Sequence, residues 1–334
     1  MINDLISIII PVKNNNLYIV ECMESVLRQT YPYIEVILVD DASSPQCAKL
    51  YDSYKSEVVK VIHLQNAGGV SHARNIGISH ARGEFIVFVD SDDIISQNYC
   101  EYLLNMIKAT NSEISACGYK RFRGRLKDTS VSELDYVYVD RTDIWNKISG
   151  GRYNVEGFLW NKMFRAQLIG GSLFDEQLSM CEDQLFVFEM MKKCNGISVC
   201  SNPLYFYREN MQSVTHQMNE QKIKQSIDVA ERLIEIVADD RQAVEGFKNN
   251  LSNMHFRYCV YLASKRPMKW AEKLSISRLA FCENYKLQCD DTRINKIEKV
   301  ILRKSKTVFV IAECFLEIAR QLYKTCTLKE RSGA

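Results

Sequence analysis

The chain lacks the features that would tie it to a membrane span or an export route. No stretch reaches the ~18 uninterrupted apolar residues that a membrane-spanning helix needs. Met1–Asp4 leads directly into a predicted strand, without the basic and apolar regions of a signal peptide. These absences predict a cytoplasmic protein that does not cross the bilayer.

The cysteine pattern and the net charge argue against two further classes. Twelve cysteines are present, yet no CxxC pair occurs, and Cys22, Cys47, Cys100 and Cys117 fall on separate predicted elements. We therefore expect reduced thiols rather than disulfides or a zinc site. The formal net charge of +2 gives no reason to expect nucleic acid as a partner.

Apolar, strand-like runs alternate with helix-like segments through the first half of the chain. The predicted strands are Leu5–Val12, Ile34–Val39, Val58–Leu64, Glu84–Val89 and Glu113–Tyr119, and the helices between them are Leu17–Arg28, Cys47–Lys55, Val70–His80 and Gln97–Ala109. This alternation predicts an α/β fold with a mainly parallel, Rossmann-like sheet flanked by helices. Beyond about Gln217 the pattern is helical, so we expect a domain over residues 1–216 and a helical region over 217–334.

The stretch Phe85–Asp93 (FIVFVDSDD) carries the most informative signal. Ligands of open α/β sheets bind beyond the carboxyl ends of the strands, and three carboxylates crowded there repel one another unless a positive charge relieves them. A divalent metal carrying a sugar-nucleotide diphosphate would do so. The alternative is that Ser91–Asp93 caps the helix beginning near Gln97, since Ser and Asp are good N-caps.

Acids also follow the second strand, which we expect beside the first. Asp41 could accept the imide N–H of a uracil, whereas Asp40 fits better as a turn residue that caps the next helix. Gly68 and Gly69 open a helix with Arg74 one turn inside, and helix N-termini and arginine both favour phosphate. The alternative for that segment is an ordinary helix start with a surface arginine.

Two later segments carry further candidates. Glu182 and Asp183 stand beside a hydrophobic run, where a carboxylate could act as a general base. Composition alone would make both of them ordinary first-turn residues of an amphipathic helix. Arg208 and His216 could meet a phosphate, although an arginine packed among aromatic side chains is the more frequent situation.

In order and spacing these segments resemble the inverting family 2 glycosyltransferases of the GT-A fold, over roughly Leu5 to His216. The matching motifs are Ser7–Val12 (SIIIPV), Ser25–Tyr31 (SVLRQTY), Val39–Asp41 (VDD), Ala73–Gly77 (ARNIG), Gly83–Asp93 (GEFIVFVDSDD), Trp160–Lys162 (WNK), Glu182–Asp183 (ED) and Tyr207–Arg208 (YR). The sequence departs from the family at Lys13, where a tyrosine is common, and at Ala42, where glycine is usual.

The resemblance implies a role for each site residue. Those of the nucleotide pocket would be Pro11, Val12, Asn14, Asp41 at the uracil, Gly68, Gly69, Arg74, Asp90 near the ribose or metal, and Ser91. Asp92 would bind Mn²⁺ or Mg²⁺, and Asp183, next to Glu182, would be the catalytic base. Trp160 would shape the acceptor pocket, and Arg208 and His216 would close over the diphosphate.

The implied reaction moves a hexose or N-acetylhexosamine from a UDP-sugar to a glycan or lipid-linked acceptor, with inversion, in the synthesis of capsule, O-antigen or lipooligosaccharide. A catalytically silent sugar-nucleotide-binding assembly subunit is the alternative. A receiver-like signalling module is disfavoured, because it needs an acidic pair where this chain has Pro11-Val12-Lys13. The residues leave the donor sugar, the linkage and the oligomeric state open.

The C-terminal segment from Ile294 mixes basic and apolar residues at helical spacing. Such a helix can lie in an anionic membrane interface, which would hold the protein at the inner face of the plasma membrane. The alternative is packing against its own domain or a partner protomer in a homo-oligomer. The resemblance favours the membrane, because acceptors of such enzymes are often lipid-linked.

Overall fold

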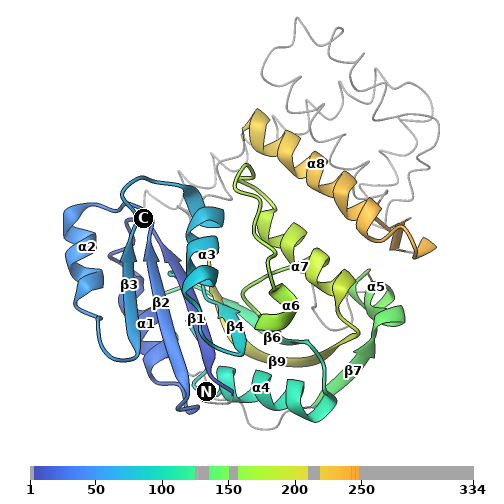
Figure 1. The fold of residues 1–334 in the computed structure, drawn as a ribbon, viewed down its shortest axis with the longest axis horizontal. Coiled ribbons are helices and arrows are strands. Elements are labelled where there is room, and N and C mark those ends of the chain that lie inside the picture. The colour runs from blue at the N-terminus through green and yellow to red at the C-terminus, as the bar shows by residue number, and fades with distance from the viewer. Residues whose placement is uncertain are drawn as a thin grey trace, which may run out of the picture. The chain divides into compact units, whose positions relative to one another are not determined.

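The structure is a computed structural model and describes residues 4–124, 126, 135–149, 157–209, 219–241, 243, 244, 246 and 247. Its sheet has nine strands in the order β3-β2-β1-β4-β8-β6-β9-β5, with β7 paired to β9 (Figure 1). The strands are β1 Ile6–Val12, β2 Ile34–Asp40, β3 Val59–His63, β4 Phe85–Phe88, β5 Ile94–Ile95, β6 Ile114–Phe122, β7 Tyr136–Asp140, β8 Lys162–Arg165 and β9 Gly196–Arg208. The helices are α1 Ile19–Leu27, α2 Pro45–Asp52, α3 Gly69–His80, α4 Tyr99–Thr110, α5 Arg141–Ser149, α6 Ala166–Ile169, α7 Glu182–Lys193 and α8 Glu220–Ile236.

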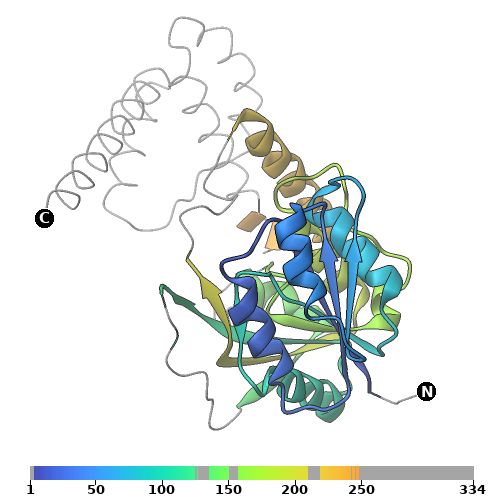
Figure 2. The same cartoon turned by 90° about the vertical axis from the view of Figure 1, so that its left-hand side faces the viewer.

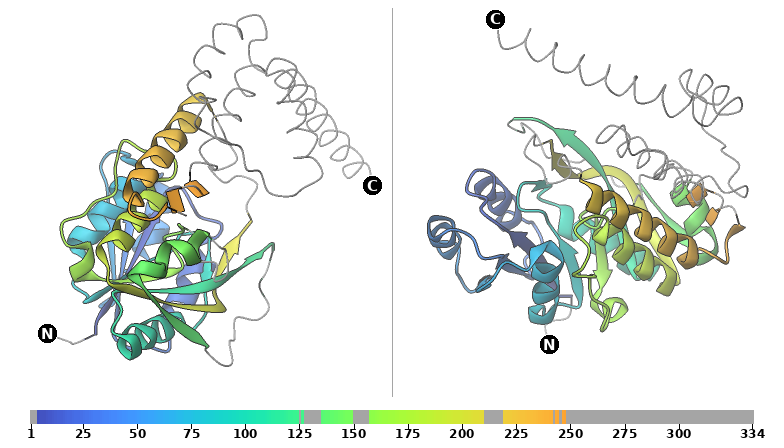
Figure 3. Two further views of the ribbon diagram at one scale, coloured as in Figure 1. Left: turned by 90° about the vertical axis from the view of Figure 1, so that its right-hand side faces the viewer. Right: turned by 90° about the horizontal axis from the view of Figure 1, so that it is seen from above.

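Helices cover both faces of the sheet, as Figures 2 and 3 show from the side and from above. One face packs on α1, α2 and α4, and the other on α3, α5, α6 and α7. The two-residue period of a strand explains how β1 serves both layers. Ile8 and Ile10 join the first core and Ile9 joins the second.

The α3 helix lies unusually close to β1. A Cβ on Gly77 would come within 2.3 Å of Ile9 Cγ2, so this contact requires a glycine in the helix. The approach matters for the site, because α3 carries Arg74 and begins at Gly69, which has a positive φ of 87°.

The strand order reverses at β1. Parallel neighbours lie on both sides of β1, with β2 on one side and β4 on the other. The chain therefore has its topological switch point at the carboxyl ends of β1 and β4, where ligands bind in open α/β sheets. Pro11, Val12 and the acidic segment after β4 lie at this edge.

The predicted α/β fold is confirmed, and every strand and helix expected up to Tyr119 is present with shifts at its ends. The half of the sheet from β3 to β4 is parallel, as predicted. Beyond it, β8 runs antiparallel between β4 and β6. The strands β7, β8 and β9 were not predicted, because the sequence pattern from Tyr136 to Arg208 is irregular. The strand β5 was not predicted because it has only two residues.

Contacts divide the chain into two compact units. Residues up to 209 and residues 235–243 belong to the first, and residues 219–234, which include most of α8, belong to the second. No helix in the described part of the chain is long and apolar enough to span a bilayer. His216 and the predicted membrane helix from Ile294 lie outside the described residues, and the domain roles remain predictions.

Candidate active site

Asp41 lies at the centre of a turn that gathers three segments predicted to form the nucleotide pocket. Its side chain is 5% exposed. It accepts the backbone N–H groups of Gly68 at 2.6 Å and Gly69 at 3.1 Å, and the ammonium group of Lys13 at 3.0 Å. Burial alone would raise the pKa of Asp41, but these donors hold it below its ordinary value. The residue is therefore ionised, with both carboxylate oxygens engaged by these donors, and its role at a uracil remains a prediction.

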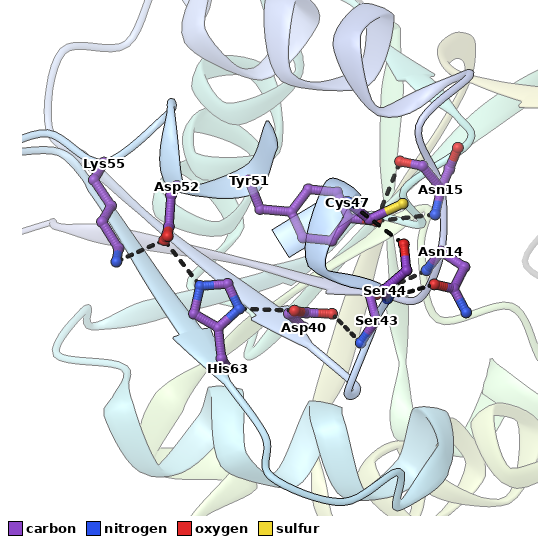
Figure 4. Close-up of polar contacts among 10 residues, drawn as sticks. All are labelled: Asn14, Asn15, Asp40, Ser43, Ser44, Cys47, Tyr51, Asp52, Lys55 and His63. Carbon is purple, nitrogen blue, oxygen red and sulfur yellow. Dashed lines mark hydrogen bonds and ion pairs between the residues drawn. The ribbon is translucent and has the colours of Figure 1, made fainter. Parts of the chain in front are cut away.

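The loops after β1 and β2 are also joined by Asn14. Its backbone N–H donates to Ser43 Oγ, and its Oδ1 accepts the N–H of Ser44, both at 2.8 Å (Figure 4). Asn14 has a φ of 50°, a conformation that asparagine tolerates better than most residues. The structure thus places Asn14 against the turn that contains Asp41.

Asp40 fixes the turn but does not cap the following helix. Its Oδ1 accepts the N–H of Ser43 at 3.0 Å, and its Oδ2 lies 2.7 Å from Nδ1 of His63 on β3. Helix α2 is instead capped by Ser44, whose Oγ accepts the N–H of Cys47 at 3.5 Å. The turn predicted for Asp40 is confirmed, and its predicted capping role is wrong because the carboxylate is committed to His63.

Arg74 is a buried residue that connects two acidic segments. Its Nη2 lies 3.1 Å from Asp90 Oδ1, its Nη1 lies 2.9 Å from Glu182 Oε1, and its guanidinium lies over the Phe174 ring at 5.4 Å. The side chain is 5% exposed, so the alternative of a surface arginine is wrong. Arg74 sets the acidic end of β4 beside the first turn of α7.

The acids after β4 occupy three different environments. Asp90 pairs with Arg74, whereas burial, followed by the charge of Asp90, raises the pKa of Asp92 to about 6. Asp93 is buried and accepts the N–H of Arg208 at 2.7 Å and the hydroxyl of Tyr205 at 2.8 Å. The helix-cap alternative for this segment is wrong, because Asp93 is bonded to β9 and β5 separates it from α4.

Asp92 fits a cation that also binds a diphosphate. In the described residues, no group of three His, Cys, Asp or Glu side chains is arranged to enclose a metal ion. Mg²⁺ sites are commonly built from one or two carboxylates, with substrate phosphates completing the shell. A carboxylate whose pKa is raised by burial and by a neighbouring acid would bind such an ion while relieving its own repulsion.

Asp183, the predicted catalytic base, lies in the first turn of α7. Burial, followed by the charge of Glu182, raises its pKa to about 7, and Arg74 opposes this rise. Its Oδ1 accepts the N–H of Gln184 at 2.7 Å in the first turn of α7. A pKa near the working pH is what general-base catalysis favours.

Two predicted residues are packed inside the protein. Arg208 donates to the carbonyls of Asp92 and Gly124 and to Glu21, between the rings of Tyr18 and Phe122. This is the aromatic packing expected as its alternative role. Trp160 is 5% exposed and stacks on the rings of Phe158, Tyr205 and Tyr207. Their roles at the diphosphate and the acceptor remain predictions.

Two residues, Asn75 and Asp93, hold the site together through contacts that the sequence did not predict. Asn75 exchanges two hydrogen bonds with the backbone of Phe174 and donates to Glu176, which fixes the segment leading to α7. Asp93 anchors the acidic segment to β9. Asn75 belongs to the quoted ARNIG motif and Asp93 to the quoted acidic triplet, but nothing local to either residue reveals its distant partner.

Comparison with known proteins identifies the family. Glycosyl transferase family 2 matches residues 7–164 of the chain. The glycosyltransferase GlyG of Streptococcus pneumoniae is 31% identical over 233 residues, which cover 64% of this chain and 73% of GlyG. The chain belongs to glycosyl transferase family 2. It is accordingly an enzyme of the glycosyltransferase class.

A second family 2 relative is known in three dimensions. The poly(ribitol-phosphate) β-N-acetylglucosaminyltransferase TarS of Staphylococcus aureus is 31% identical over 207 residues, which cover 60% of this chain but 35% of TarS. A crystal structure of TarS residues 1–349 in complex with UDP-GlcNAc superposes with a TM-score of 0.59 at 23% identity, covering 84% of this chain and 89% of that one. The likeness confirms the predicted GT-A fold.

Proposed function

We propose that this family 2 glycosyltransferase moves a hexose or N-acetylhexosamine from a UDP-sugar to a glycan or lipid-linked acceptor, with inversion. The observation that carries the proposal is the ion-paired cluster of Asp90, Arg74 and Glu182, which joins the acidic end of β4 to the segment that holds Asp183. The product would belong to a surface polysaccharide. TarS, named for a poly(ribitol-phosphate) acceptor, supports a polymeric acceptor.

The uridine end of the donor would lie against the turns that follow β1 and β2. Asp41 would accept the imide N–H of uracil, since a carboxylate makes a stronger charge-assisted bond than a neutral acceptor does. Its neighbour Lys13, with a side chain 47% exposed, could turn toward a phosphate. The TarS complex with UDP-GlcNAc makes that sugar nucleotide the first donor to test.

Asp183 would take the proton of the acceptor hydroxyl. The freed oxygen would attack the anomeric carbon from the face opposite the diphosphate, and the bond from that carbon to the diphosphate oxygen would break. A single displacement of this kind inverts the anomeric centre. Arg74 would assist the base indirectly, because its positive charge opposes the rise in the pKa of Asp183 and keeps that pKa at about 7.

Asp92, with Asp90 beside it, would hold Mn²⁺ or Mg²⁺ against the diphosphate. When bound, such an ion stabilises the negative charge of the departing UDP.

A UDP-release assay over a panel of UDP-sugars with Mn²⁺ tests this function. We expect slow hydrolysis of one donor without acceptor, and a faster release once a glycan acceptor is added. GDP-mannose, followed by the release of GDP, is the control for the base, since it lacks the uracil. Release from GDP-mannose in preference to every UDP-sugar would contradict the assignment of Asp41.

We also propose that the basic segment from Ile294 makes peripheral contact with an anionic membrane. Sedimentation with phosphatidylglycerol vesicles, compared with neutral phosphatidylcholine vesicles, measures this contact. Replacing Arg303, Lys304 and Lys306 with glutamine should release the protein from the anionic vesicles, because each basic residue near the surface contributes about 1 kcal/mol. Equal sedimentation of the full chain with both vesicles would exclude the contact.

A further inference from the structure

Asn15 connects the loop after β1 with the loop after β4 and with helix α2. It follows β1 directly after Asn14, and its side-chain amide donates to Ser91, to the carbonyl oxygen at 3.0 Å and to Oγ at 3.2 Å. Ser91 stands between Asp90 and Asp92. The amide of Asn15 is thus bonded to the backbone of the segment that carries both acids.

The backbone of Asn15 is itself held from the side of α2. The hydroxyl of Tyr51 accepts the N–H of Asn15 at 2.9 Å and donates to its carbonyl at 3.2 Å (Figure 4). Tyr51 is fully buried in the core beneath the sheet. Because a buried ring has little freedom, these two bonds give Asn15 a fixed position from which to hold Ser91.

We infer that Asn15 is a positioning residue for the metal-binding acids Asp90 and Asp92. The inference rests on the proposed function. Its two bonds to Ser91 fix the peptide between the acids, so they set where both carboxylates point. Groups of this kind, one bond removed from the metal ligands, typically change metal affinity or activity by about 10- to 100-fold when they are altered.

A purely structural role for Asn15 would rest on its other side-chain contact. Its Oδ1 accepts the N–H of Tyr18 at 3.0 Å, in the turn that leads into α1. This bond stabilises the start of the helix and has no bearing on a metal. The two roles use different atoms, so substitutions can separate them.

Asn15→Ser keeps an oxygen that can serve the turn, since Ser and Asn are comparable in capping, but it removes the amide that donates to Ser91. The readout is the Mn²⁺ concentration that half-saturates the UDP-bound protein in a calorimetric titration, which requires no turnover. We expect it to rise about 10- to 100-fold, with the melting temperature close to wild type and with the rate of UDP release restored by excess Mn²⁺. Asn16→Ser is the matched control, because Asn16 is the exposed neighbour.

Asn15→Asp serves as a second variant if the serine variant folds poorly, since it keeps both the size and the acceptor oxygen while losing both donors. Its control is Asn16→Asp, which adds the same charge to the same loop. A half-saturating Mn²⁺ concentration equal to that of the control would overturn this inference but leave the proposed function standing. Wild-type protein that releases UDP without any dependence on metal would overturn the proposed function as well.

Discussion

Arg74 Nη1 lies 2.9 Å from Glu182 Oε1, although 108 residues separate the two in sequence. The second amino group of Arg74 reaches Asp90, so a single guanidinium joins α3 to both β4 and α7. The side chains of Arg74 and Glu182 are 5% and 12% exposed. One ion-paired group therefore holds the acidic segment after β4 beside the first turn of α7, which carries the predicted base Asp183.

Arg74→Met tests this connection. Methionine keeps the apolar length over Phe174 but leaves Glu182 and Asp90 without their cation. We expect a loss of about 3 kcal/mol in the free energy of unfolding, the low end of the range for a broken buried pair, measured by urea denaturation. Arg28→Met, which breaks an exposed pair with Glu24, is the control and should cost less than about 0.5 kcal/mol. Equal losses would show that the Arg74 pairs contribute no more than surface pairs.

Asp183→Asn should abolish transfer while leaving UDP binding intact. Removal of a general base typically lowers the rate by about 10²- to 10⁴-fold. In the wild type, kcat/KM should rise with pH through about 7, because the base acts in its ionised form. A UDP-release assay across this pH range measures the loss of rate and the pH profile, and calorimetric titration measures UDP binding. Undiminished transfer by Asp183→Asn would remove Asp183 from the base role.

The same substitution should change the pH dependence of stability. The folded-state pKa of Asp183 is raised to about 7, so the folded chain holds its proton to a higher pH than the unfolded chain does. The free energy of unfolding of the wild type therefore falls as pH rises from about 4 to about 7. The neutral amide of Asp183→Asn would carry no such penalty, so the melting temperature of the variant should gain on wild type across this window. A constant difference would contradict the raised pKa.

The stability of the protein should also depend on the protonation of His63, whose charged form is the stabilising one. Its Nε2 lies 2.9 Å from Asp52 and its Nδ1 lies 2.7 Å from Asp40 (Figure 4). The hydrogen bond with Asp52, opposed by burial and aided by Asp40, raises the pKa of His63. Its stabilising contribution is complete below the unfolded pKa of about 6.5 and is lost as pH rises through the higher folded value.

His63→Gln should remove that contribution, so thermal melts of wild type and variant should differ most at pH 6 and converge toward pH 8. The matched control is His80→Gln, since His80 contacts the carbonyl of Ile76 and the hydroxyl of Ser79 rather than carboxylates. A difference between wild type and His63→Gln that grows with pH would refute the raised pKa of this histidine.

Ala42 occupies the left-handed region, with a φ of 54°. A side chain in that conformation costs roughly 1–2 kcal/mol, part of which glycine would return as greater freedom of the unfolded chain. Ala42→Gly should therefore stabilise the protein by about 0.5–1 kcal/mol in urea denaturation. Ala48→Gly, inside α2, is the control and should destabilise it by a similar amount. Destabilisation by both substitutions would show that the turn is unstrained.

Apart from the two-residue strand β5, the strands and helices of the first 119 residues could be predicted because their patterns are local. Continuous apolar runs identify β1, β2 and β4, and the topological rule then places the acids at one edge of the sheet. The resemblance to the family then supplied the predicted role of each site residue. Ala42 illustrates the limit of motif reading, since the backbone keeps the conformation usual for glycine although the glycine is gone.

The remainder depends on contacts between distant segments. Asp93 reads as a helix cap by its neighbours, but Tyr205 and Arg208 on β9 hold it instead. Arg74 reads as a surface residue until Asp90 and Glu182 are placed on either side of it. The short strands β5 and β8 form through pairing with β9, β4 and β6, and four residues or fewer carry too little periodicity to reveal them.

The most direct test of the account is calorimetric titration of UDP into the protein with and without Mn²⁺, repeated with Asp92→Ala. We expect Mn²⁺ to tighten UDP binding by at least about tenfold, or about 1.4 kcal/mol, and the alanine variant to lose this gain while keeping the weaker, metal-independent binding. Binding of UDP that is equally tight with and without Mn²⁺ in the wild type would contradict the central claim, that the acids after β4 hold a nucleoside diphosphate through a divalent ion.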